Sequence, residues 1–311
     1  MAFALVFPGQ GSQSVGMMDS YGASSAIRET FAEASEALGE DLWQMASVGP
    51  AERLALTVNT QPLMLTAGVA VYRAWLAAGG SRPALVAGHS LGEYSALVAA
   101  GALSFADAVP LVRFRAQAMQ EAVPEGEGAM AALMGLDIED VRATCAEAAR
   151  GEVVDAANLN MPGQIVIAGA KAAVERAMTL ATAKGAKRAV LLPVSAPFHC
   201  ALMKPAAERL RERLATVRIS KPEIDVLNNV DVAVQDDPEK IRDALVRQAF
   251  SPVRWIESVT AMTARGLTRV VECGPGKVLA AMTRRISKDV EGGSLHDAAS
   301  LEQMLAEMGM E

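Results

Sequence analysis

Residues 84–93 read Ala-Leu-Val-Ala-Gly-His-Ser-Leu-Gly-Glu. The apolar run 84–87 has strand character, and the segment 93–100 is typical of a helix. Between them lies Gly88-His89-Ser90-Leu91-Gly92, a G-x-S-x-G sequence in the strand–turn–helix context that exposes a serine hydroxyl on a sharp turn. The glycines permit the turn, and the helix directs its positive end toward the hydroxyl. The stretch predicts Ser90 as a nucleophile; the alternative is an ordinary turn that matches by chance.

The segments around this stretch continue the alternation of strands and helices. The pattern predicts strands at 3–7 and 268–272, and helices at 25–38, 60–78, 105–122 and 277–286. Such alternation is typical of a parallel sheet covered by helices, an α/β fold.

Residues 126–197 follow a different order. Strand-like runs at 128–135, 152–158, 164–169 and 188–192 enclose helical runs at 138–150 and 171–184. This βαββαβ order is the ferredoxin-like pattern. We therefore expect a discontinuous large domain, 1–125 with 198–290, that carries an inserted small domain at 126–197. A cleft between the two is the expected place for a site, and 291–311 is expected to be a C-terminal tail.

Composition narrows the class of protein. The net charge of −7 argues against general nucleic-acid binding. No run reaches the roughly 18 apolar residues of a membrane helix, and the first residues resemble a strand rather than a signal peptide. Three cysteines, without metal-ligand spacing, favour a reducing cytoplasmic compartment. We expect a cytoplasmic monomer without a metal site.

A serine nucleophile needs a base, and the chain has only three histidines. His89 is adjacent to Ser90, where neighbouring side chains diverge, and His296 lies in the polar tail. His199 is left as the expected base, although a lone histidine also commonly caps a helix or sits satisfied in a core. The adjacent Cys200 suggests a cysteine nucleophile as an alternative, but no other feature marks it, and a small buried residue is its expected role.

One arginine lies where an apolar side chain is expected. In the helix at 105–122, Arg115 falls on the apolar stripe, whereas Arg113 falls on the opposite, solvated face. A buried guanidinium must be paired. Either Arg115 forms a structural salt bridge with a carboxylate of this chain, or its fork awaits a carboxylate on a substrate.

Two glycine-rich turns, 8–13 and 274–277, match no phosphate-binding loop. A backbone N–H in the first is either a second donor to an oxyanion at Ser90 or part of a plain turn.

Taken in order, these motifs resemble malonyl-CoA:acyl-carrier-protein transacylases, over nearly the whole chain. The resemblance rests on Phe7-Pro8-Gly9-Gln10-Gly11-Ser12-Gln13, Thr60-Gln61-Pro62, Gly88 to Glu93, Arg115 at 25 residues past the serine, Asn160 to Gln164, Phe198-His199, Gln248 and Gly274-Pro275-Gly276-Lys277. It implies an α/β-hydrolase-like large domain with a ferredoxin-like insert.

The resemblance also assigns roles to single residues. It implies that Ser90 is acylated, that His199 is its base and that Arg115 binds the malonyl carboxylate. The backbone N–H groups of Gln10 and Leu91 would form the oxyanion hole. Gln248 would orient His199 through its main-chain carbonyl. The family also places Gln61, His89, Asn160 and Phe198 in the site, and Phe198 is typical of its malonyl-using branch.

The implied reaction is a ping-pong transfer of malonyl from malonyl-CoA, through Ser90, to the phosphopantetheine thiol of acyl carrier protein, with no bound cofactor. Acidic carrier proteins need a basic docking patch. One candidate is Arg284, Arg285 and Lys288; another is Lys184, Lys187 and Arg188; solvated surface charge is the alternative for both.

Other functions remain open from the sequence. A serine esterase or thioesterase shares the G-x-S-x-G turn but passes the acyl group to water. A non-catalytic subunit that binds carrier protein would not need a serine, a histidine and an arginine together. Within the family, polyketide synthesis and malonate decarboxylation are alternatives to fatty acid synthesis.

Overall fold

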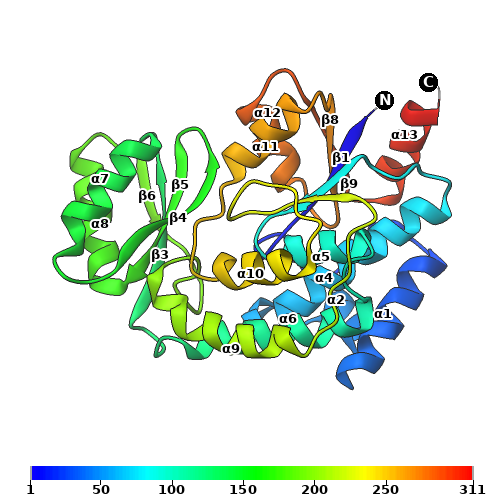
Figure 1. Cartoon of the computed structure of the whole chain (residues 1–311), viewed down its shortest axis with the longest axis horizontal. Helices are drawn as coiled ribbons and strands as arrows, with labels where there is room; N and C mark the ends of the chain where they lie inside the picture. Colours follow the sequence, from blue (N-terminus) through cyan, green and yellow to red (C-terminus); the bar gives the residue numbers. More distant parts are fainter. Residues whose placement is uncertain (1, 310–311) are drawn as a thin grey trace.

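A parallel five-stranded sheet forms the centre of the larger part of the molecule (Figure 1). The computed structural model describes residues 2–309. The strand order is β7 (Asp225–Leu227), β2 (Leu85–Gly88), β1 (Phe3–Phe7), β8 (Arg269–Cys273) and β9 (Glu291–Leu295). All four pairings are parallel, and every residue of β1 is buried. The apolar run 3–7 thus forms the expected central strand, since strands buried on both faces are continuously apolar.

Helices cover both faces of this sheet (Figure 1). They are α1 (Ser25–Leu38), α2 (Leu42–Val48), α3 (Ala51–Ala55), α4 (Thr57–Ala77), α5 (Gly92–Ala99), α6 (Phe105–Glu121), α9 (Lys204–Ala215), α10 (Pro238–Gln248), α11 (Trp255–Ala264), α12 (Val278–Ile286) and α13 (Ala298–Gly309), with short 3-10 turns η1 (Asp19–Tyr21) and η2 (Ala201–Met203). Among residues 2–309, no helix combines the length and hydropathy needed to cross a bilayer.

A second sheet lies at one end of the molecule (green in Figure 1). It is antiparallel, in the order β4 (Val154–Met161), β5 (Gln164–Ala170), β3 (Gly128–Met134) and β6 (Arg188–Leu191). Helices α7 (Ile138–Ala149) and α8 (Lys171–Ala183) pack on it and enclose a separate apolar core. The predicted α/β fold class with a βαββαβ insert is confirmed. The domain limits, 126–197 for the insert and 1–125 with 198–290 for the large domain, stay a prediction.

The C-terminal stretch is more ordered than the expected tail. Residues 291–295 form β9, which extends the parallel sheet beside β8, and α13 follows it. The hydroxyl of Tyr21 donates a hydrogen bond to the carbonyl of Leu295 at 2.5 Å. Glu-Gly-Gly-Ser-Leu has low strand propensity, so its pairing with β8 rather than its composition makes it a strand. Residues 310–311 of the expected tail lie outside the described part.

The turn between β2 and α5 is built on very close backbone packing. Strand β2 ends at Gly88 and helix α5 begins at Gly92, in parallel register with β1 so that Gly88 faces Phe7. A Cβ atom on Gly92 would lie 2.0 Å from the carbonyl oxygen of Phe7. Only glycine fits at this position, and the turn after β2 therefore lies directly against the end of β1.

We expect Gly92→Ala to destabilise the protein by about 3 kcal/mol or more, because the new methyl group overlaps the rigid backbone of β1. In an unobstructed helix the same change is stabilising. The matched control is Gly39→Ala, where the backbone is left-handed (φ 65°) but no atom lies within 4 Å of the new Cβ; its cost should be about 1–2 kcal/mol. Urea unfolding measures both, and equal losses would contradict the packing argument.

Candidate active site

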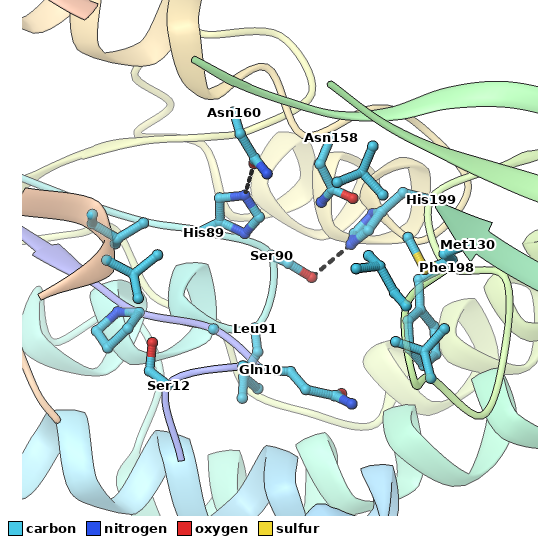
Figure 2. Close-up of a pocket in the computed structure, with 18 of the residues that line it drawn as sticks. Gln10, Ser12, His89, Ser90, Leu91, Met130, Asn158, Asn160, Phe198 and His199 are labelled. Atoms are coloured by element: carbon cyan, nitrogen blue, oxygen red, sulfur yellow. Dashed lines mark hydrogen bonds between the residues drawn. The ribbon is translucent and has the colours of Figure 1, made fainter. Parts of the chain in front are cut away.

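Ser90 occupies the sharp turn that the sequence predicts. Its backbone is left-handed, with φ 52°, which is uncommon for a residue with a side chain. The hydroxyl oxygen lies 2.7 Å from Nε2 of His199, 109 positions later in the chain (Figure 2). The structure thus brings the predicted nucleophile and the predicted base into hydrogen-bond contact.

His199 is held by main-chain contact on its other side. Nδ1 lies 2.9 Å from the carbonyl oxygen of Gln248, the last residue of α10. Because a carbonyl only accepts, Nδ1 carries the proton and Nε2 faces Ser90 as an acceptor. Burial, with a smaller effect of the Arg115 charge, lowers the pKa of His199 to about 3. The imidazole is therefore neutral at physiological pH, as a general base must be.

Arg115 on α6 lies against the same serine. Its side chain is 1% exposed, and its Nη2 donates to the Ser90 hydroxyl at 3.1 Å and to Oε1 of Gln248 at 2.9 Å. Nη1 donates to Oε1 of Gln61 at 2.8 Å. Among residues 2–309, no carboxylate oxygen lies within the 4.0 Å of an ion pair with this guanidinium. Its polar partners are thus neutral groups, and the internal salt bridge considered as an alternative is absent from the described residues.

The neighbouring Arg113 differs from its expectation as a solvated arginine. Its guanidinium forms a two-pronged ion pair with Glu40, at 2.9 and 3.1 Å, and its side chain is only 16% exposed. The helical period placed it correctly on the opposite face from Arg115, but helix α1 and the loop after it cover that face.

The two residues expected to supply backbone amides to the site, Gln10 and Leu91, come from different elements. Gln10 follows β1, and Leu91 begins the turn of α5; both line the same cavity as Ser90. Figure 2 shows Gln10 and Leu91 together on one side of Ser90, with His199 on the other. Neither amide N–H has an acceptor among the described residues. The role of both amides as donors to an oxygen anion at Ser90 stays a prediction.

The cavity has a volume of about 410 Å³ and lies between the two sheets. Nine of the ten residues to which the resemblance gives a place in the site line it: Gln10, Gln61, His89, Ser90, Leu91, Arg115, Asn160, Phe198 and His199. Gln248 lies behind them. His89 Nε2 is 2.9 Å from Oδ1 of Asn160, which joins the large sheet's turn to β4 of the small sheet (Figure 2).

The other sequence candidates lie outside the cavity. Arg284, Arg285 and Lys288 are exposed in and just after α12, a helix that lines the cavity with Leu279 and Met282. The thiol of Cys200 is buried and donates to the carbonyl of Pro197, and burial raises its pKa to about 12. The thiol is therefore protonated at neutral pH, which disfavours the cysteine-nucleophile alternative.

Sequence reasoning missed two residues in contact with this site. Asn229 accepts a hydrogen bond from the Ser90 amide at 2.8 Å, and Glu93 accepts one from the Gln248 side chain at 2.9 Å. The motif in the sequence contains Glu93 but indicates no role for it. One signal could have indicated Asn229: it follows the short strand β7 at the carboxyl edge of the sheet, where ligand-contacting residues gather.

The arrangement suits one kind of chemistry. A hydroxyl beside a neutral imidazole could attack an acyl carbon, and backbone amides near it could stabilise the resulting anion. The adjacent guanidinium would hold an anionic end of the acyl group. Among residues 2–309, no cluster of three or more His, Cys, Asp or Glu side chains is placed to hold a metal ion.

Comparison with known proteins agrees with this geometry. The sequence model of the acyl transferase domain matches residues 4–305. The chain is 56% identical to the malonyl CoA-acyl carrier protein transacylase of Escherichia coli K12, over 96% of this chain and 97% of the relative.

Solved structures superpose closely as well. The acyl-carrier-protein S-malonyltransferase of Burkholderia pseudomallei 1710b gives a TM-score of 0.97 at 60% identity, with 98% of this chain and 100% of the other covered. A malonyl transacylase solved in complex with its type II polyketide acyl-carrier protein also gives 0.97, at 50% identity, with 99% and 100% covered. The chain belongs to the acyl transferase domain family.

Proposed function

We propose that the chain is a malonyltransferase that moves a malonyl group from coenzyme A to the phosphopantetheine thiol of an acyl carrier protein. Relatives at 55–56% identity carry this activity in their names. The observation that carries the proposal is the Arg115 guanidinium, 3.1 Å from the Ser90 hydroxyl and without a carboxylate partner among the described residues. A cation in this position fits an acyl group that ends in a carboxylate.

In the first half-reaction, the carboxylate of malonyl-CoA binds Arg115 and the thioester carbonyl lies over Ser90. His199 takes the hydroxyl proton while Ser90 attacks. The amides of Gln10 and Leu91 donate to the oxyanion, and each such donor typically contributes about 3–4 kcal/mol to the transition state. The thioester bond then breaks, His199 protonates the sulfur of coenzyme A as it departs, and malonyl-Ser90 remains.

In the second half-reaction, the carrier thiol enters the same cavity. His199 accepts its proton, the thiolate attacks the ester of malonyl-Ser90, and the proton returns to Ser90. No atom changes its oxidation state when a thioester is exchanged for an ester, so the proposed reaction uses no bound redox cofactor. Ping-pong kinetics are the expected signature.

The surrounding residues take supporting roles in this proposal. Gln61 and Gln248 hold the guanidinium of Arg115 through their side-chain oxygens. The Gln248 carbonyl orients His199. His89, Asn160 and Phe198 would shape the acyl end of the cavity that they line.

We further propose a cytoplasmic location and a carrier protein of fatty acid synthesis as the acceptor. A carrier protein of type II polyketide synthesis is the second candidate, because the solved complex of a 50% identical relative contains one. The basic patch, defined as Arg284, Arg285 and Lys288, is the proposed docking surface, since it is exposed and lies in and just after α12, the helix that also lines the cavity.

Arg115→Ala should lower kcat/KM for malonyl-CoA by about 100-fold or more, since one side of a buried charged contact is lost. Acetyl transfer and hydrolysis, which need no cation, should be retained in part. The measurement is thiol release from malonyl-CoA and acetyl-CoA in parallel. Undiminished malonyl transfer would assign Arg115 a purely structural role.

The pH profile reports the base directly. An ordinary histidine with pKa near 6.5 would cost about tenfold in rate at pH 5.5. Because the pKa of His199 is lowered to about 3, the neutral base persists at that pH. Single-turnover acylation by malonyl-CoA should therefore stay nearly constant from pH 7.5 down to 5.5, and a midpoint near 6.5 would contradict this.

Charge reversal of the basic patch tests docking. Arg284→Glu with Arg285→Glu should raise the KM for carrier protein several-fold and leave the KM for malonyl-CoA unchanged, because complementary charge mainly steers association. The KM for carrier protein should be compared with that of a second variant in which the charges of Lys187 and Arg188, in the small domain, are reversed. An unchanged carrier KM for the first pair would remove the patch from the proposal.

A further inference from the structure

A second charged side chain is buried close to the site. Glu93 lies in the first turn of α5, three residues after Ser90, and is 2% exposed. No lysine, arginine or histidine nitrogen among residues 2–309 lies within the 4.0 Å of an ion pair with it. A buried carboxyl group without an ion-pair partner is costly unless hydrogen bonds satisfy it.

The hydrogen bonds of Glu93 converge on one oxygen. Its Oε2 accepts from Nε2 of Gln248 at 2.9 Å and from the backbone N–H of Asn229 at 2.9 Å. The two donors come from sequence positions more than 130 residues away, on α10 and after β7. Glu93 therefore joins α5 to two further elements at a single point.

The first branch leads through Asn229 to the backbone of the nucleophile. Oδ1 of Asn229 accepts the Ser90 N–H at 2.8 Å, and Nδ2 donates to the carbonyl of Gly88 at 2.7 Å. The Asn229 side chain thus hydrogen-bonds to the backbone on both sides of the turn in which Ser90 adopts φ 52°. A left-handed serine of this kind costs roughly 1–3 kcal/mol and needs such support.

Two arginines also hold the loop that carries Asn229, Arg247 from α10 and Arg254 from the residue before α11. Arg247 holds both oxygens of Asp231, at 2.7 and 2.8 Å, and Arg254 donates to the carbonyl of Val230 at 3.1 Å. These contacts hold Val230 and Asp231, whereas the backbone N–H of Asn229 itself is held by Glu93 at 2.9 Å.

The second branch leads through the Gln248 side chain. Its Nε2 donates to Glu93 and also to the Ser90 carbonyl at 3.0 Å, while its Oε1 accepts from Arg115. The carboxyl oxygen that accepts on one side and the guanidinium that donates on the other allow only this amide orientation. A flipped amide would place its NH₂ group against Arg115.

We propose that Glu93 is a positioning residue for acyl transfer, in which Oε2 acts as one shared acceptor that sets the turn geometry of Ser90 and the amide orientation of Gln248. The inference rests on the proposed function. The family comparison supplies a fold and an activity, whereas this role follows from the contacts of Glu93 alone.

The role requires an acceptor oxygen and not a negative charge. Burial, partly offset by the hydrogen bond from Gln248, raises the pKa of Glu93 to about 7, so the group is in part protonated at neutral pH. A protonated carboxyl group keeps its carbonyl oxygen as an acceptor, as an amide does. Glutamine at this position would therefore present an oxygen of the same reach.

Two substitutions separate the acceptor from the charge. Glu93→Gln removes the charge and keeps an oxygen in place, whereas Glu93→Asp keeps the charge and withdraws the oxygen by about one bond length, ~1.5 Å. We expect Glu93→Gln to retain kcat for malonyl transfer within about fivefold. Glu93→Asp should lose about 100-fold, because a misplacement of about 1 Å has that effect. The KM for malonyl-CoA should change by less than about threefold in both variants.

A second readout does not depend on the malonyl group. A fluorophosphonate labels an activated serine, and its rate at Ser90 should follow the same order, with the glutamine variant faster than the aspartate variant. If the unaltered chain is labelled but transfers no malonyl group, the proposed function fails while the positioning role is still decided by this order.

The control is Glu272→Gln, the same substitution at another buried carboxyl group. Glu272 accepts from the Ala280 amide at 2.9 Å at the start of α12 and has no contact with the Glu93 network. The Glu272→Gln substitution should lower the melting temperature yet leave kcat within about twofold of that of the unaltered chain. The proposal would be overturned by unchanged kcat in both Glu93 variants, by equal losses of kcat in both, or by a faster aspartate variant. Melting curves should confirm that all the variants are folded.

Discussion

The site is organised around a positive charge enclosed by neutral groups. The guanidinium of Arg115 is buried, and its hydrogen bonds go to two amide oxygens and one hydroxyl. A desolvated charge whose hydrogen-bond partners are all uncharged acts strongly on its neighbours, since the surrounding dielectric is low. It contributes to the lowered pKa of His199. The helices that bring Gln61 and Gln248 to the guanidinium are therefore as important to the site as the nucleophile's own turn.

The two sheets make different contributions. The parallel sheet places the ends of β1 and β2 side by side, so that Gln10 and Leu91 meet at Ser90. The antiparallel sheet supplies the opposite wall through residues such as Met130. The chain returns from that sheet just before His199, so the base lies where the two parts meet. This agrees with the general location of ligands at the carboxyl ends of parallel strands.

Much of this arrangement was predictable because its signals are local. The G-x-S-x-G turn, the βαββαβ order and the apolar stripe that contains Arg115 depend on residues close in sequence. The partners were less accessible: Asn229 and Gln248 each lie more than 130 positions from Glu93, which both contact, and no periodicity encodes these contacts. The strand β9 was missed for a similar reason, because a Gly-Gly segment pairs only when a neighbouring strand is already in place. For Gln248, Gln10 and Leu91, the family resemblance supplied what the residues alone did not.

The weak basicity of His199 has a consequence for where protons reside during turnover. An imidazolium with a pKa of about 3 releases its proton almost completely in a neutral solution. A cavity that communicates with water cannot store a proton on such a group between substrates. Under the proposed reaction, the proton that the departing thiol receives must be the one that the serine has just released. In each half-reaction the proton that His199 accepts is then the proton that it donates. No proton has to be exchanged with the buffer during acyl transfer.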